Sequence, residues 1–220
     1  MAKQALPEEK DLKRKASLVN RRLKARHPDA YCELNFETPE QLLIATILSA
    51  QCTDKRVNIV TEKLFKSFKE PKDYLEKPLE ELETFIKSTG FFRQKAKSIR
   101  GAMQILVEKH GGKAPKKMEE LVELPGVGRK TANVVLGNAY DIPGLPVDTH
   151  VTRLCNRIGI CEGKDAVKIE SKLNSLLDKK HWTLFSLRLI FHGRRVCPAR
   201  TPKCSECCLT DICDYYDGQN

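Results

Sequence analysis

The sequence predicts an all-α protein, and three observations support this prediction. Apolar residues recur at intervals of three and four positions through most of the chain, which is the period of an amphipathic helix. Residues typical of helix starts and helix ends stand between these segments. No segment shows a convincing strand pattern, and none is of low complexity.

The first part of the chain is expected to form a series of helices. A basic amphipathic helix ends at His27. Thr38, Pro39 and Gln41 are the residue types that favour the N-cap, the first turn and the third position of a helix. The residues after them are apolar on most faces, so we expect a central core helix there. Further helices are expected over 54–68, around 74, over 78–88 and over 92–110.

A glycine turn links two helices in the middle of the chain. The segment Met118 to Leu124 is expected to be a short helix that ends at Pro125. Gly126 and Gly128 then relieve steric limits on the turn. The next helix is predicted to begin near Arg129, with this buried stripe: Ala132, Val135, Leu136 and Ala139.

Lys130 would lie on the opposite side of that helix, exposed in its first turn. The N–H groups at a helix start form a ready site for a phosphate. An amine in this position could also act as a nucleophile. The alternative is a plain turn between helices with a surface lysine, and the turn alone does not decide between them.

Three helices are expected after this turn. Asp148 begins one that ends at Gly159, with Thr149 as an alternative cap, and Asp165 caps a second. The last long helix is expected from Trp182 to Val196.

The composition indicates a polyanionic partner. The chain has 220 residues, a net charge of +10 and a pI near 9.2, which favour nucleic acid over a membrane. No apolar run approaches the roughly 20 residues of a membrane span, and the N-terminus lacks a signal peptide pattern. We therefore expect an intracellular protein with one large or two small domains.

The basic residues are also segregated along the chain. Between Lys87 and Val107 there are five lysines and arginines and no acidic residue. Between Asp73 and Glu83 there are five acidic residues and one lysine. A solvated charged face usually mixes signs, so this clustering favours a nucleic-acid-binding surface.

The cysteine pattern predicts a metal centre near the C-terminus. Five of the nine cysteines lie within the 17 residues from Cys197 to Cys213. In a protein expected to be intracellular, this density favours metal binding over disulfides. The spacing C-x6-C-x2-C-x5-C gives four thiolate ligands: Cys197, Cys204, Cys207 and Cys213. Iron–sulfur and zinc both remain possible from the spacing, and Cys208 is interpreted as a spare thiol.

Several motifs together resemble the endonuclease III family of the helix-hairpin-helix (HhH-GPD) superfamily. They are LPGVGRKTA at 124–132, VDTH at 147–150, LSAQCTD at 48–54, and HGR ahead of the four cysteines. The resemblance covers about 30–213. It implies a six-helix domain with the hairpin over 32–142, and a second domain of 1–31 with 143–220. The second domain would hold a [4Fe-4S] cluster on the four cysteines, and the active site would lie in the cleft between the domains.

The resemblance also implies roles for single residues. Lys130 would be the nucleophile and Asp148 the essential carboxylate. Gln51 would enter the space left by a flipped nucleotide, and Phe91 stands at a second wedge position where an aliphatic residue is common. Contacts with DNA are expected from the turn and the last helix: Gly126, Gly128, Arg129 and Arg194.

The implied function is that of a bifunctional DNA glycosylase and AP lyase of base excision repair. Its partner would be double-stranded DNA with a damaged pyrimidine or an abasic site, and it would act as a cytoplasmic, bacterial monomer associated with the nucleoid through DNA. The alternative is a relative that only binds DNA, or is mainly an AP lyase, with a structural metal cluster. An adenine-excising relative is disfavoured by Lys130, and an electron-transfer protein would leave the hairpin and the +10 charge unexplained.

Overall fold

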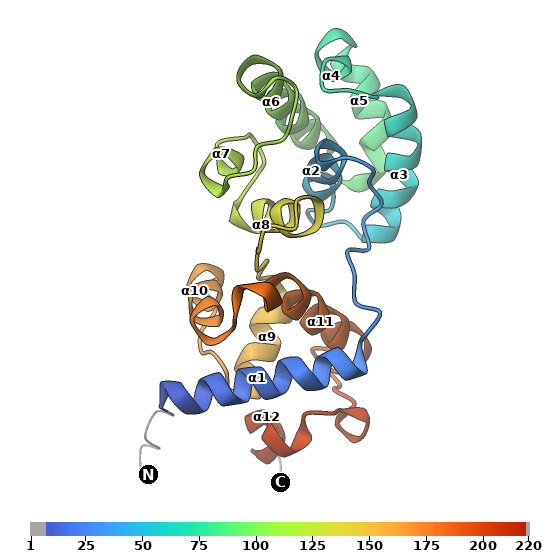
Figure 1. The fold of residues 1–220 in the computed structure, drawn as a ribbon. Coiled ribbons are helices and arrows are strands. Elements are labelled where there is room, and N and C mark those ends of the chain that lie inside the picture. Colours follow the sequence, from blue (N-terminus) through green and yellow to red (C-terminus); the bar gives the residue numbers. More distant parts are fainter. Residues whose placement is uncertain (1–7, 219–220) are drawn as a thin grey trace. The chain divides into compact units, whose positions relative to one another are not determined.

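A computed structural model describes residues 8–218 and confirms the all-α fold class, with no β-strand in that range (Figure 1). The chain divides into two compact units, Cys32–Gly144 and Met1–Tyr31 with Leu145–Asn220. We call them the hairpin unit and the cysteine unit. Residues 1–7 and 219–220, at the ends of the predicted discontinuous domain, lie outside the described residues. Within residues 8–218, every helix is either too short or too polar to span a membrane.

The hairpin unit contains seven α-helices and one 3₁₀ turn among its described residues. They are α2 (Pro39–Leu48), α3 (Asp54–Ser67), α4 (Asp73–Glu76), α5 (Leu79–Ile86), η1 (Lys87–Thr89), α6 (Phe92–His110), α7 (Met118–Val122) and α8 (Arg129–Ala139).

Helix α2 is the core of the hairpin unit, as predicted. Eight of its ten residues are buried, and it contacts α3, α6 and α8. The predicted start is confirmed, because the Thr38 hydroxyl accepts a hydrogen bond from the Gln41 amide at 3.2 Å. The Gln41 side chain accepts one from the Glu37 amide at 2.8 Å, so two amides at the helix start are satisfied.

The cysteine unit joins the first helix to the C-terminal part of the chain. Its elements are α1 (Glu9–Arg26), α9 (Thr149–Ile158), α10 (Ala166–Leu176), η2 (Lys179–His181), α11 (Trp182–Arg195), η3 (Cys204–Glu206), η4 (Thr210–Ile212) and α12 (Asp214–Asp217).

Helix α1 packs against α10 and α11 through a stripe that includes Ala16, Val19 and Leu23. Ion pairs on the polar side of α1 reach the C-terminal segment, from Lys15 to Asp214 and from Arg22 to Asp211.

The predicted helix ends need small corrections. The helix expected over 78–88 ends at Ile86 and tightens into the 3₁₀ turn η1, while α7 ends at Val122 and α11 at Arg195. The elements η2, η3, η4 and α12 were not predicted, because three or four residues are too few to show a helical period.

The basic segment before Val107 is only partly a surface feature. Lys95 is 5% exposed, and its ammonium donates hydrogen bonds to backbone carbonyls inside the hairpin unit. Arg100 is half-buried and donates to the carbonyls of Tyr74 and Lys77. Two of the five charges therefore support the fold, and the clustering along the sequence does not by itself place them on a binding surface.

The burial pattern predicts that two substitutions that remove the same number of carbon atoms differ greatly in their effect on the free energy of unfolding. Leu43→Ala empties a site that is 0% exposed and should lower the free energy of unfolding by about 2–5 kcal/mol. Ile59→Ala acts on a side chain that is 46% exposed and should change it by no more than about 0.5 kcal/mol. Urea denaturation of both variants measures the difference, and equal losses would contradict a core centred on α2.

Candidate functional site

The turn between α7 and α8 is a compact hairpin held by its own backbone. The amide of Leu124 donates to the Leu121 carbonyl at 3.2 Å, and the amide of Val127 donates to the Leu124 carbonyl at 3.0 Å. Leu121, Leu124 and Val127 are buried, while Pro125, Gly126 and Gly128 are exposed. The apolar side chains thus anchor the hairpin, and the glycine backbone faces solvent.

The two glycines of the turn have different reasons for being there. Gly126 has φ +78°, and a Cβ atom at this position would lie 2.7 Å from Cβ of Ser98 on α6. Both facts require glycine. Gly128 has φ −92°, which any residue adopts, and a Cβ there would meet nothing within 4 Å. The expectation that both glycines relieve steric limits was therefore right for Gly126 and wrong for Gly128.

Lys130 lies in the first turn of α8 and is exposed, as the helical period predicts. Ala132, Val135 and Leu136 are buried on the other side of the helix. Arg129 is also exposed, and α8 has no hydrogen bond from a side chain at its N-cap. A helix start of this kind can bind an anion beside the Lys130 amine.

Gln51 and Phe91 both stand in strained backbone on the surface of the hairpin unit. Their φ angles are +54° and +48°, in the left-handed region that side chains other than glycine rarely adopt. Phe91 is 69% exposed and Gln51 is also exposed. An exposed phenylalanine on a left-handed residue has no evident packing role, and such strain is concentrated at functional positions.

Asp148 is the N-cap of α9 in the cysteine unit. Its Oδ1 accepts a hydrogen bond from the Val151 amide at 2.8 Å, and the side chain is half-buried. The alternative of Thr149 as the cap was wrong, because Thr149 is already the first helical residue. The cap holds the carboxylate in one orientation at the start of the helix.

His150 lies beside Asp148 in the first turn of α9. Burial lowers the pKa of His150, against the opposing effect of Asp148. The Arg153 guanidinium, which can only donate, lies 3.1 Å from His150 Nδ1. This contact holds the His150 ring beside Arg153.

Two arginines on α9 support the cysteine loop. Arg153 donates to the carbonyls of Gly193 and Cys197 at 3.1 and 2.9 Å. Arg157 donates to Cys197 Sγ at 3.1 Å and to the Pro198 carbonyl at 2.9 Å. Helix α9 therefore presents Asp148 at its start and holds the first cysteine of the loop further along.

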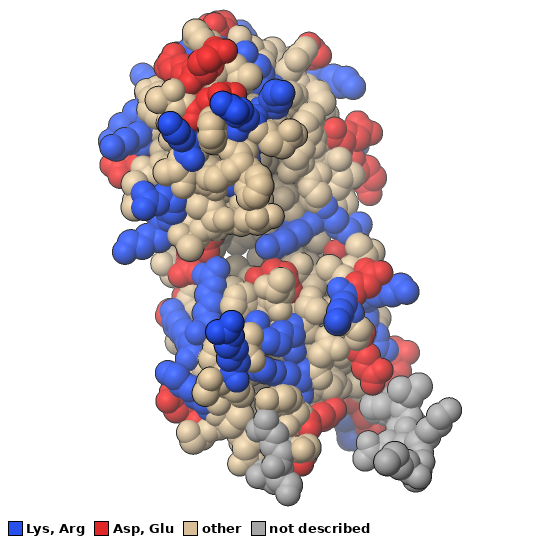
Figure 2. All heavy atoms as spheres, turned by 180° about the vertical axis from the view of Figure 1, so that it is seen from behind, with Lys and Arg blue, Asp and Glu red and all other residues tan. Residues whose placement is uncertain are grey.

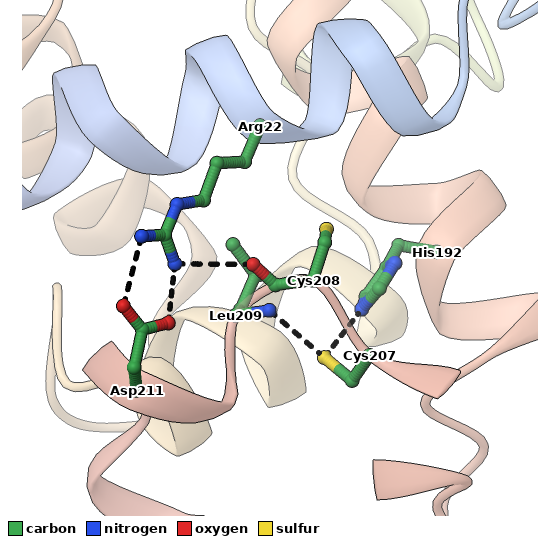
Figure 3. Close-up of polar contacts among 6 residues, drawn as sticks. All are labelled: Arg22, His192, Cys207, Cys208, Leu209 and Asp211. Atoms are coloured by element: carbon green, nitrogen blue, oxygen red, sulfur yellow. Dashed lines mark hydrogen bonds and ion pairs between the residues drawn. The ribbon is translucent and has the colours of Figure 1, made fainter. Parts of the chain in front are cut away.

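Cys207 and the adjacent Cys208 face different surroundings (Figure 3). Cys207 Sγ accepts from the Leu209 amide and contacts His192 Nε2, both at 3.4 Å. The Cys208 side chain points away from Cys207 Sγ, and its carbonyl accepts from Arg22 at 3.1 Å. This divergence separates the predicted ligand from the thiol interpreted as spare.

The four predicted ligands are half-buried thiols that influence one another. Burial above all raises the pKa of Cys207 to about 11, with smaller contributions from Cys208, Cys197 and Cys213. Burial also raises the pKa of Cys213, with contributions from Cys197 and Cys204. Thiolates are thus unfavourable here without a compensating cation, which a metal centre would supply.

The four cysteines can be compared with the donors that a metal centre requires. In a [4Fe-4S] cluster each of four thiolates binds a different iron, so the sulfurs surround a cluster and do not meet at one ion. In type and number, the four thiols match the donors that such a cluster requires.

Positive charge gathers on the cysteine unit. On the face shown in Figure 2, Lys and Arg side chains form a group over this unit. Arg194, in the last turn of α11, is exposed and close enough to His150 to lower its pKa. Arg194 therefore lies near the start of α9, where Asp148 stands.

Sequence reasoning missed three polar residues that shape these sites: Lys95, Arg153 and Arg157. A signal for Lys95 was present, because it lies four positions before Ile99 on the buried stripe of α6. Arg153 and Arg157 are four positions apart on one helix, but exposed arginine pairs share that spacing, so it is not diagnostic.

The comparisons with known proteins agree with this geometry. A family model described as HhH-GPD superfamily base excision DNA repair protein matches residues 44–179. Endonuclease III of Synechocystis sp. is 49% identical over 202 residues, covering 91% of this chain and 92% of the relative. Endonuclease III of Escherichia coli K12 is 43% identical over 202 residues, covering 89% and 93%.

Solved structures give the same answer. A non-covalent endonuclease III–DNA complex matches with a TM-score of 0.90 and 41% identity, covering 94% of this chain and 97% of that one. A trapped endonuclease III–DNA covalent intermediate also matches with a TM-score of 0.90 and 41% identity, covering 94% and 98%. The chain therefore belongs to the HhH-GPD superfamily of base excision DNA repair proteins and, within it, to the endonuclease III family.

Proposed function

We propose that this protein is a bifunctional DNA glycosylase and AP lyase that removes oxidised pyrimidines from duplex DNA and then cleaves 3′ to the abasic site. The observation that carries the proposal is the exposed Lys130 in the first turn of α8, directly after the glycine hairpin. A relative of this fold was captured as a covalent intermediate with DNA, and a lysine amine is a group that can form one.

Binding to the DNA backbone begins at the hairpin. The exposed backbone around Gly126 and Gly128, with Arg129, offers N–H groups and positive charge to a phosphate. Arg194 adds a second cation from the cysteine unit. These contacts carry no base specificity and would position the protein on the duplex.

The damaged nucleotide must leave the base stack before its sugar can react. Gln51 and Phe91 are the side chains proposed to fill the opened duplex, because both are exposed on strained backbone of the same unit. Phe91 would act as an apolar wedge, and Gln51 would offer amide hydrogen bonds in place of the lost base pair.

In the first chemical step, the neutral Lys130 amine attacks C1′ of the extruded nucleotide. The glycosidic bond breaks, and the base leaves with its electron pair and takes up a proton. The sugar ring opens and a Schiff base forms between Lys130 and C1′. Asp148 would accept the proton that the amine loses and stabilise the cationic sugar, since its Oδ1 is fixed by the cap and its carboxylate is half-buried.

In the second step, the Schiff base acidifies the proton on C2′. Its removal forms a double bond between C2′ and C3′, and the bond from C3′ to its phosphate oxygen breaks by β-elimination. Water then hydrolyses the imine and frees Lys130. Nothing in these steps transfers an electron, so the proposed cluster has no part in them.

The residues that would hold a [4Fe-4S] cluster are Cys197, Cys204, Cys207 and Cys213. When bound, it would supply the cation that lets these half-buried thiols ionise. The loop would then hold its basic residues in one shape against phosphates. We also propose a monomer that acts in the bacterial cytoplasm, where the DNA is.

Borohydride trapping tests the Schiff base. The protein should become covalently attached to duplex DNA that contains an abasic site or an oxidised pyrimidine, because borohydride reduces the imine to a stable amine. Lys130→Ala should abolish trapping and keep DNA binding, while Lys109→Ala, a change at an exposed lysine of α6, should leave trapping unchanged. No trapping by the intact protein would instead favour a relative that only binds DNA, and trapping on abasic sites alone would favour a mainly AP-lyase relative.

The substitution Asp148→Asn tests the proposed catalytic role of the carboxylate separately from its role as the N-cap of α9. Asparagine caps helices about as well as aspartate, so the unfolding free energy should change little. Single-turnover base release should fall by about 10²–10⁴-fold, the usual contribution of a general acid or base. Base release at a normal rate would reduce Asp148 to a helix cap.

The proposed cluster ligands predict the iron content of the protein and which cysteine substitution lowers it. The purified protein should be yellow-brown with roughly four iron atoms per chain. Cys207→Ser should lose iron, whereas Cys208→Ser should retain it because that side chain points elsewhere. Stoichiometric zinc without iron, or equal iron loss in the two variants, would refute the assignment.

A further inference from the structure

Lys95 is a buried cation whose position in the hairpin unit is unexpected for a lysine. Its residue is 5% exposed, and it lies in the first turn of α6. Its Nζ donates two hydrogen bonds of 2.8 Å, one to the carbonyl of Leu48 and one to the carbonyl of Thr89. One ammonium therefore joins two segments that are about 40 residues apart in the chain.

The first acceptor belongs to the loop that carries Gln51. Leu48 is the last residue of α2, so its carbonyl is among those that a helix end leaves without an intrahelical partner. The chain then turns through Ser49, whose carbonyl accepts from the Cys52 amide at 3.1 Å. Gln51 stands in this turn with φ +54°, three residues after the carbonyl that Lys95 holds.

The second acceptor belongs to the loop that carries Phe91. Thr89 ends η1, and Gly90 and Phe91 follow with φ angles of +72° and +48°. The Phe91 carbonyl accepts the backbone amide of Lys95 at 3.0 Å. Lys95 thus contacts this loop at two points. Its side chain donates to the Thr89 carbonyl, and its backbone amide donates to the Phe91 carbonyl.

The two hydrogen bonds of the Lys95 ammonium indicate a positioning role. A buried ammonium costs free energy unless its hydrogen bonds are made, and both of its partners here are carbonyl oxygens at element ends. A cation also interacts favourably with the C-terminal end of α2. Burial lowers the pKa of Lys95, because a buried site disfavours the charged form.

We propose that Lys95 is a positioning residue for base extrusion, whose ammonium sets the spacing between the Gln51 and Phe91 loops so that both side chains can enter the opened duplex. This inference rests on the proposed function, and it adds a residue that touches neither the DNA nor the reacting atoms. Lys95 acts before the chemistry, so its effect should appear only when a base pair must be opened.

Lys95→Met tests the proposal, because methionine fills similar volume and removes the charge and the donors. Single-turnover borohydride trapping is measured on two substrates, an oxidised pyrimidine in a duplex and an abasic site in a single strand. Duplex trapping should fall by about tenfold or more, since opening a base pair costs a few kcal/mol. Single-strand trapping should stay within about twofold of the unmodified protein, since no pair has to open.

The ratio of the two rates decides the outcome. Equal loss on both substrates would mean that Lys95 supports only the fold, and no loss on either would remove it from base extrusion. If the unmodified protein fails on the single strand as well, the proposed function fails and not the role of Lys95. Lys109→Met removes one exposed charge from the same helix and should leave the ratio unchanged.

Two further variants sharpen the test. Lys95→Gln keeps an amide donor and should lie between the unmodified protein and Lys95→Met; it replaces Lys95→Met if that variant does not fold. The pair Gln51→Ala and Phe91→Ala should show the same duplex-selective loss. Adding Lys95→Met to that pair should cause little further loss, because the side chains that Lys95 positions are already gone, whereas an additive loss would overturn the coupling.

Discussion

The close approach of Gly126 to Ser98 is the constraint on which the hairpin unit depends. A Cβ atom at Gly126 would lie 2.7 Å from Cβ of Ser98, so the turn can press against α6 only because residue 126 is glycine. One turn further along α6, a Cβ at Gly101 would lie 3.1 Å from Cγ of Pro125 in the same hairpin. The contact between the turn and α6 places the start of α8 at Arg129. It therefore also places Lys130, the second residue of α8.

The same face of α6 also organises the two exposed loops. Lys95, Ser98 and Gly101 are spaced at i, i+3 and i+6, so they lie along one side of the helix. Lys95 joins the ends of α2 and η1, while Ser98 and Gly101 receive the hairpin. One helix therefore relates Lys130, the proposed nucleophile, to the two side chains proposed to open the duplex, which suits a site that needs fixed geometry.

Helix α9 has a comparable part in the cysteine unit. Its N-cap presents Asp148, and one side of the helix carries Arg153 and Arg157, which donate to the loop from Gly193 to Pro198. Guanidinium groups suit this task because several fixed donors can hold several carbonyls at once. The carboxylate and the cysteine loop are thus both held by one helix.

Features that depend on neighbouring residues could be predicted from the sequence. The helix starts at Thr38 and Asp148 follow from capping residues, which act within one turn. The exposed position of Lys130 follows from the helical period of its neighbours. Three outcomes could be read only from the folded chain: Lys95 turns inward, Cys208 points away from Cys207, and Gly126 needs to be glycine while Gly128 does not. These outcomes depend on residues that are remote in the chain. Lys95, for example, donates to the carbonyl of Leu48, which is 47 residues away. A local sequence pattern contains no information about such a partner.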